Sequence, residues 1–156
     1  MDQIEFLKSN SLFKGFDEAS ILKFAEVFEE LEYESGGIVF EENTPADALY
    51  IIMEGCVNIY IKNSEGKQIM IGRLIQNETL GLLSLIGNFE HLINAVAQEN
   101  TTILKLPRQK FIELNKTNPQ MSLRLILNAF SEFVKLLQEN SETFKFIIET
   151  YISKKV

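Results

Sequence analysis

The stretch that decides the fold is residues 72–106, GRLIQNETLGLLSLIGNFEHLINAVAQENTTILKL. Strand-like segments lie in it or at its edge, at 68–74, 94–98 and 102–106, with polar turns between them at 77–78 and 99–100. Gly81 stands in the middle, among the apolar residues Leu80, Leu82, Leu83, Leu85 and Ile86. The stretch therefore predicts short strands joined by tight turns.

The same pattern extends back to Gly37. Ser64-Glu65-Gly66 is a good hairpin loop because glycine adopts positive φ without penalty. Short strands at near-regular spacing predict a barrel or roll. The further candidate strands are 38–40, 49–53 and 57–62.

Helical patterns flank the predicted roll. Asp17 is a plausible N-cap for a helix whose apolar residues recur at helical spacing, and a first strand is expected near 31–34. Pro107 suits the first turn of a helix running to about Thr117. Asn118-Pro119 then breaks the chain before a long helix that starts at Gln120.

The predicted class is α+β, mainly β, in one domain spanning 1–156. We expect a double-stranded β-helix or jelly-roll barrel of about eight strands with N-terminal helices and a long C-terminal helix. The expected bounds are N-terminal helices 1–35, β-roll 36–106 and C-terminal helices 107–156.

Composition argues against several kinds of partner. The chain has 15 Lys and Arg against 22 Asp and Glu, a net charge of −7, so it lacks the basic surface that nucleic acid requires. No apolar run is long enough to span a bilayer, and the first residues do not resemble a signal peptide. The single cysteine, Cys56, reads as a small apolar filler and fits a reducing compartment. We expect a cytoplasmic protein that binds neither nucleic acid nor membrane.

Catalytic signatures are missing from the sequence. One histidine, His91, cannot build a clustered-histidine metal site, and there is neither a G-x-S-x-G elbow nor a phosphate-binding G-x-x-x-x-G-K-[ST] loop. We expect no enzyme, no catalytic residue, no metal and no cofactor.

Four segments, in order and at the right spacing, carry a resemblance. Residues 43–55 fit G-x-x-A-D-x-L-Y-x-I-x-x-G with Asn43 at the first glycine, and 74–81 fit L-G-P-G-D-x-x-G. Residues 81–93 fit G-E-x-A-L-L-x-x-x-x-R-[ST]-A, and 103–111 fit L-L-x-L-x-R-x-x-F. The chain thus resembles the cyclic-nucleotide-binding domain family, which implies a β-roll with a phosphate-binding segment that begins at Gly81.

The same resemblance shows what has been replaced. The family's glutamate, which binds the ribose, falls on Leu82; its phosphate-binding arginine falls on His91; and its serine or threonine falls on Leu92. Gly81, Leu82 and Leu83 still offer backbone N–H groups at a helix start. The resemblance therefore implies a degenerate ligand-binding cassette, in which a cyclic nucleotide would lack its usual polar partners.

Two interpretations of this cassette stay open. In the first, its apolar residues fill the pocket as core; in the second, they line an apolar pocket for a different ligand. His91, beside Glu90, is expected at the surface rather than at a phosphate.

The last helix has a heptad pattern. Leu123, Phe130, Leu137, Phe144 and Tyr151 recur every seven residues, and Ile126, Phe133, Asn140 and Ile147 follow three residues after the first four. Family relatives commonly pair through this helix, so we expect a homodimer with an interface of Leu123, Ile126, Phe130, Phe133 and Leu137. The alternatives are a break at Asn140-Ser141, with 144–152 folding back on the barrel, and an unidentified protein partner.

Two functions follow. The first is a stand-alone regulatory or interaction domain without ordinary tight binding of cAMP or cGMP. The alternative is a small-molecule sensor that binds a cyclic nucleotide weakly, or another ligand in the same pocket, and signals through the C-terminal helix.

Overall fold

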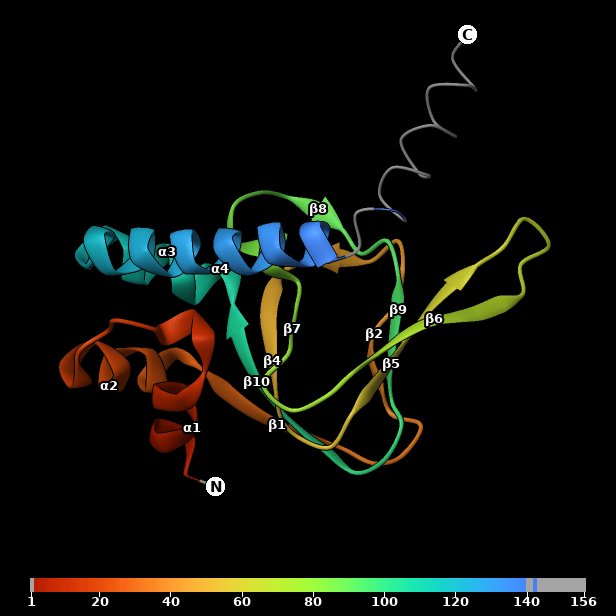
Figure 1. Cartoon of the computed structure of the whole chain (residues 1–156), viewed down its shortest axis with the longest axis horizontal. Coiled ribbons are helices and arrows are strands. Elements are labelled where there is room, and N and C mark those ends of the chain that lie inside the picture. Colours follow the sequence, from red (N-terminus) through yellow and green to blue (C-terminus); the bar gives the residue numbers. More distant parts are fainter. Residues whose placement is uncertain (1, 140–141, 143–156) are drawn as a thin grey trace, which may run out of the picture.

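The computed structural model describes residues 2–139 and 142 (Figure 1). The chain starts with α1 (Gln3–Ser9), the 3₁₀ turn η1 (Ser11–Phe13) and α2 (Glu18–Val27). The Asp17 carboxylate accepts the N–H of Ser20 at 2.9 Å, which confirms Asp17 as the cap of α2. Asn10 caps η1 in the same way, through the N–H of Leu12 at 3.0 Å.

Strands make up the middle of the chain. One four-stranded antiparallel sheet has the order β1-β10-β4-β7, a second has the order β2-β9-β5-β6, and β3 pairs with β8. The bounds are β1 (Glu29–Tyr33), β2 (Ile38–Phe40), β3 (Pro45–Ala46), β4 (Ala48–Glu54), β5 (Val57–Lys62), β6 (Gln68–Leu74), β7 (Thr79–Leu80), β8 (Phe89–Glu90), β9 (Asn94–Ala97) and β10 (Thr101–Pro107).

The predicted α+β class, antiparallel strands with flanking helices and a long C-terminal helix, is confirmed. The described residues hold ten strands where about eight were expected, and three of the ten have only two residues. A two-residue strand shows no alternation in the sequence, so periodicity does not reveal it.

Two apolar clusters share strands β4 and β10. Successive side chains of a strand point to opposite faces. Leu49, Ile51 and Met53 of β4 accordingly pack against the helices. Tyr50 and Ile52 of the same strand face the second sheet, inside the roll. Because β4 is covered on both faces, its sequence from Ala48 to Met53 is a continuous apolar run.

Two helices complete the described chain, α3 (Arg108–Thr117) and α4 (Pro119–Glu139). Pro107 is the last residue of β10 rather than the first of a helix, because its ψ of 134° is extended. In Figure 1, α4 crosses the top of the molecule, with α1 and α2 on the left and the β5–β6 hairpin on the right. The predicted break at Asn140-Ser141 and the heptad residues beyond it lie outside the described residues.

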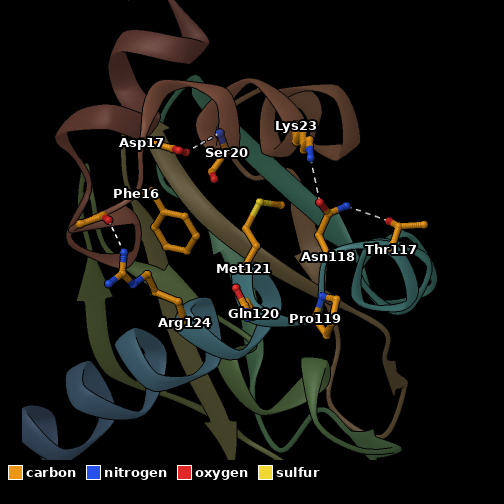
Figure 2. Close-up of a pocket in the computed structure, with 11 residues that line it drawn as sticks. Phe16, Asp17, Ser20, Lys23, Thr117, Asn118, Pro119, Gln120, Met121 and Arg124 are labelled. Carbon is orange, nitrogen blue, oxygen red and sulfur yellow. Dashed lines mark hydrogen bonds between the residues drawn. The ribbon is translucent and has the colours of Figure 1, made fainter.

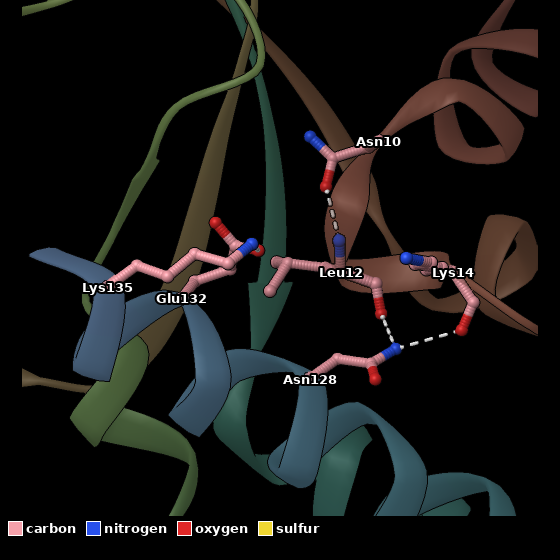
Figure 3. Close-up of polar contacts among 6 residues, drawn as sticks. All are labelled: Asn10, Leu12, Lys14, Asn128, Glu132 and Lys135. Atoms are coloured by element: carbon pink, nitrogen blue, oxygen red, sulfur yellow. Dashed lines mark hydrogen bonds and ion pairs between the residues drawn. The ribbon is translucent and has the colours of Figure 1, made fainter.

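Polar contacts tie α4 to the N-terminal helices (Figure 3). The Asn128 side chain donates to the carbonyl oxygens of Leu12, at 2.7 Å, and Lys14, at 3.1 Å. One helical turn later, Glu132 and Lys135 form an ion pair at 3.0 Å. The start and end of the described chain therefore form one packed unit.

Over residues 2–139 and 142, no helix is long and apolar enough to cross a bilayer.

Candidate ligand-binding site

Gly81 forms the turn from β7 into a short 3₁₀ element, η2 (Leu82–Leu85). Its φ is 74°, in the left-handed region that favours glycine. A Cβ at this position would lie 2.4 Å from the carbonyl oxygen of Ala48. Ser84 fixes the turn, because its N–H and its hydroxyl both donate to the Gly81 oxygen, at 2.9 and 2.6 Å. Glycine is thus required here for backbone reasons, whether or not a ligand binds.

The apolar residues around Gly81 divide into buried and exposed groups. Leu80 and Leu85 are buried in the two core clusters, and Leu82 is partly buried against the helical core. Leu83 and Ile86 are 49% and 59% exposed. Of the two interpretations left open by the sequence, a role as core therefore agrees with the burial of Leu80 and Leu85 and in part with that of Leu82. Leu83 and Ile86 are not core residues. A four-residue 3₁₀ turn has too few positions to bury every side chain.

His91 is buried, and the expectation of a surface histidine is wrong. Its side chain stacks on Phe40, with ring centroids 3.7 Å apart and planes 7° from parallel. The backbone N–H of His91 donates to the carbonyl oxygen of Thr44 at 2.8 Å. The carbonyl oxygen of His91 accepts the backbone N–H of Asn43 at 2.7 Å. These bonds continue the β3–β8 pairing and turn the imidazole inward.

Electrostatics make this imidazole a poor substitute for arginine. Burial lowers the pKa of His91 below its ordinary 6.5, and the negative charge of Asp47 opposes that shift only in part. The ring is therefore neutral at pH 7 and supplies no fixed positive charge for a phosphate. Leu92, the next residue, is 84% exposed. Gly81, Leu82 and Leu83 lie together at the turn into η2. The His91 side chain is instead buried against Phe40, and the Leu92 side chain is exposed.

The interior of the roll is packed with apolar and aromatic side chains. The centre of the Phe40 ring lies 5.6 Å from that of Tyr50, with the two planes tilted by 41°, so Phe40 lies between His91 and Tyr50. Burial raises the pKa of Tyr50 to about 12, so its hydroxyl stays neutral. The amide of Asn94 is also buried, and its oxygen accepts the N–H of Glu42 at 3.0 Å. The other buried members of this cluster are Val39, Ala48, Ile52, Val57, Ile59, Leu80, Ala95 and Ile103.

Phe40 and Asn94 are site residues that sequence reasoning missed. Phe40 was assigned to a strand, without any indication that its ring would meet His91, which lies 51 positions later in the chain. Asn94 was the first residue of a predicted strand, where a buried amide is not expected. Among residues 2–139 and 142, no group of three His, Cys, Asp or Glu side chains is placed to hold a metal ion.

The expected interface residues lie on different sides of α4. Leu123 and Phe130 are 58% and 62% exposed, whereas Ile126 packs against the helical core. Phe133 is half-buried beside a small apolar cavity of about 50 Å³, and Leu137 is half-buried too. The other residues that line this cavity are Leu82, Leu83, Ile86, Ile126, Ala129 and Phe130. The cassette thus lies directly against α4.

Comparison with known proteins agrees with this geometry. A curated relative, neuropathy target esterase sws of Drosophila melanogaster, is 30% identical over 132 residues, which cover 80% of this chain and 9% of that protein. The chain therefore spans only a small part of the relative. The fold also matches the catabolite activator protein of Thermus thermophilus, with a TM-score of 0.75 and 23% identity over 88% of this chain and 63% of that one.

A third match has a different ligand. It is the regulatory subunit of a cAMP-independent protein kinase A from Trypanosoma cruzi bound to guanosine, with a TM-score of 0.70 and 22% identity over 94% of this chain and 49% of that one. The family profile described as cyclic nucleotide-binding domain matches residues 30–118, from the first strand to the end of α3. This chain belongs to the cyclic nucleotide-binding domain family.

Proposed function

We propose that this chain is a regulatory or interaction domain that has kept the family's fold and lost ordinary tight binding of cAMP and cGMP. The observation that carries the proposal is the stack of neutral His91 on Phe40, at 3.7 Å. It places an uncharged ring in the cassette where the family has an arginine. We infer no enzymatic activity and a cytoplasmic location, because the sequence carries none of the catalytic motifs considered above and its single thiol, Cys56, is buried.

The expected loss of affinity is large. Arginine binds phosphate through two charge-assisted hydrogen bonds, which a neutral imidazole does not provide. Leu82 offers no acceptor to a ribose hydroxyl. Each hydrogen bond to a charged group contributes about 1.5–3 kcal/mol. Losing two of them corresponds to about a 10²–10⁴-fold weaker complex.

A sensor for another ligand is the alternative, and one comparison favours it. The Trypanosoma cruzi neighbour is described as cAMP-independent and bound to guanosine, a nucleoside without phosphate. Such a ligand would not need the missing arginine. In this alternative, binding beside η2 would be transmitted to α4, which the cassette contacts around Phe130 and Phe133.

Thermal unfolding with added ligand separates the two functions, because a ligand that binds only the native state raises the melting temperature. We expect no rise with millimolar cAMP or cGMP. A saturable rise with either would overturn the main proposal, and a rise with guanosine alone would support the sensor. The double variant Leu82→Glu with His91→Arg should show no rise in melting temperature with cAMP. Adding Phe40→Val should open space beside residue 91 and restore some binding of cAMP.

We also propose that the exposed side of α4 pairs two copies of the chain. Leu123, Leu127 and Phe130 are each 58–62% exposed on one long helix, which is unusual for a monomer surface. Of the expected interface, Leu123 and Phe130 lie on this side, while Ile126, Phe133 and Leu137 would contribute at its edge.

Sedimentation equilibrium of the whole chain tests this pairing. We expect a dimer that Phe130→Glu dissociates. Leu22→Glu, an exposed leucine on α2, is the matched control and should leave the dimer intact. A monomeric wild-type chain at high micromolar concentration would contradict the dimer and leave a different protein as the partner of this surface.

A further inference from the structure

A cleft of about 780 Å³ lies between the start of α2 and the junction of α3 with α4 (Figure 2). Gly15, Phe16 and Asp17 form one wall, and residues 117–121 form the facing one. None of the residues that line it belongs to the cassette around Gly81 or to the small cavity beside η2. Its volume falls within the range of small-molecule sites, roughly 300–1,000 Å³.

Two cations from different helices line this cleft. Lys23 of α2 donates to the side-chain oxygen of Asn118 at 2.8 Å. Arg124 of α4 donates to the carbonyl oxygen of Gly15, and its guanidinium carbon lies 5.9 Å from the centre of the Phe16 ring. Each cation is therefore oriented by a contact to the opposite wall, which lowers the entropy cost of engaging a ligand.

The charge in the cleft is opposite in sign to that of the whole chain. The chain carries −7, yet the lining has Lys23 and Arg124 against one carboxylate, Asp17. That carboxylate accepts the N–H of Ser20 as the cap of α2, so it is held at the edge of α2 but keeps its negative charge. The two cations still outnumber the single carboxylate, and this excess of positive charge favours an anionic guest.

The groups on the walls indicate the class of guest. Arginine presents a planar fork of donors that matches phosphate oxygens, and lysine adds a point charge. Phe16 and Met121 provide apolar surface between them for the body of a small molecule. We propose that this cleft is a second ligand site, which takes a small phosphorylated molecule whose anionic oxygens contact Lys23 and Arg124.

Titration of the whole chain with inorganic pyrophosphate at constant ionic strength, followed by backbone amide NMR shifts, tests the site. We expect saturable shifts centred on the cleft residues. The double variant Lys23→Gln with Arg124→Gln should weaken binding at least tenfold. Lys62→Gln with Lys67→Gln removes two charges from exposed positions on the β5–β6 hairpin, outside the cleft, and should change the affinity less than twofold.

Three results would overturn the site: no saturable shift in the wild type, shifts centred away from the cleft, or an equal loss in both double variants. If loss of Arg124 impairs folding, Lys23→Gln alone is the test variant, because Lys23 is exposed and its side chain makes an exposed hydrogen bond to Asn118. Inorganic phosphate, pyrophosphate and a sugar phosphate, titrated in parallel, distinguish a simple anion site from one that also binds the body of the molecule. The outcome is independent of whether the roll binds a nucleotide.

Discussion

The interior of the roll and the cleft beside α2 use their polar groups in opposite ways. In the roll, His91 is buried, neutral and stacked on Phe40, and the space around it is packed. In the cleft, Lys23 and Arg124 line a hollow of about 780 Å³. His91, which stands where the family resemblance places a phosphate-binding arginine, is thus buried among core side chains. The more open polar hollow lies among the helices, at a place to which no sequence motif points.

Removing the aromatic stack should give the largest effect. Phe40 is 8% exposed and contacts both His91 and Tyr50, so Phe40→Ala should lower the free energy of unfolding by about 3–5 kcal/mol. Phe89→Ala, at a ring that is 49% exposed, is the control and should cost much less. Urea denaturation measures both. Equal small losses would mean that the roll interior is not the packed core described above.

The turn at Gly81 should give the next largest effect. Gly81→Ala introduces both a strained φ and a Cβ 2.4 Å from a backbone oxygen, and should destabilise the fold by about 1–3 kcal/mol. Gly66 provides a matched control, because its φ of 78° is similar and no atom lies within 4 Å of its added Cβ. The difference in the free energy of unfolding between Gly81→Ala and Gly66→Ala measures the cost of the contact between the new Cβ and the carbonyl oxygen of Ala48. No difference would show that β4 and the turn separate easily.

Protonation of His91 should produce a smaller, pH-dependent effect. Its pKa is lowered by burial, so the unfolded chain binds more protons than the native one below pH 6.5. The contribution of this group to stability is therefore complete above that pH and decreases as the pH falls through the native pKa. His91→Phe should flatten the dependence of melting temperature on pH between 5 and 7. An unchanged slope would contradict a buried imidazole.

Lys23→Gln should have the smallest effect on stability, within about 0.5 kcal/mol, because its bond to Asn118 is exposed. The same variant should weaken pyrophosphate binding, so stability and binding should separate in the cleft. In the roll, by contrast, the main effect of each substitution should be on the stability of the fold. Thermal unfolding without ligand provides the measurement, and a loss above 1 kcal/mol would make Lys23 a structural residue.

Local features were predictable from the sequence, and long-range contacts were not. The cap at Asp17, the glycine turn at 81 and the left-handed Asn43, with φ of 61°, follow from the preferences of single residues. The contact of Phe40 with His91 joins strands far apart in the chain, and no periodic pattern records which way a single imidazole points. The cleft was missed for the same reason, because Lys23 and Arg124 are 101 positions apart.

The bonds from Asn128 to the oxygens of Leu12 and Lys14 have a consequence for synthesis on the ribosome. Helices α1 and α2 leave the ribosome before α4, yet Phe6, Leu7 and Leu12 belong to the same core cluster as Leu104, Leu125 and Ala129. Because synthesis proceeds at roughly 5–20 residues per second, these apolar side chains stay exposed for several seconds before the residues that bury them have been made. A nascent chain arrested before α4 should therefore bind a holdase chaperone through its first helices, and release it once α4 has emerged.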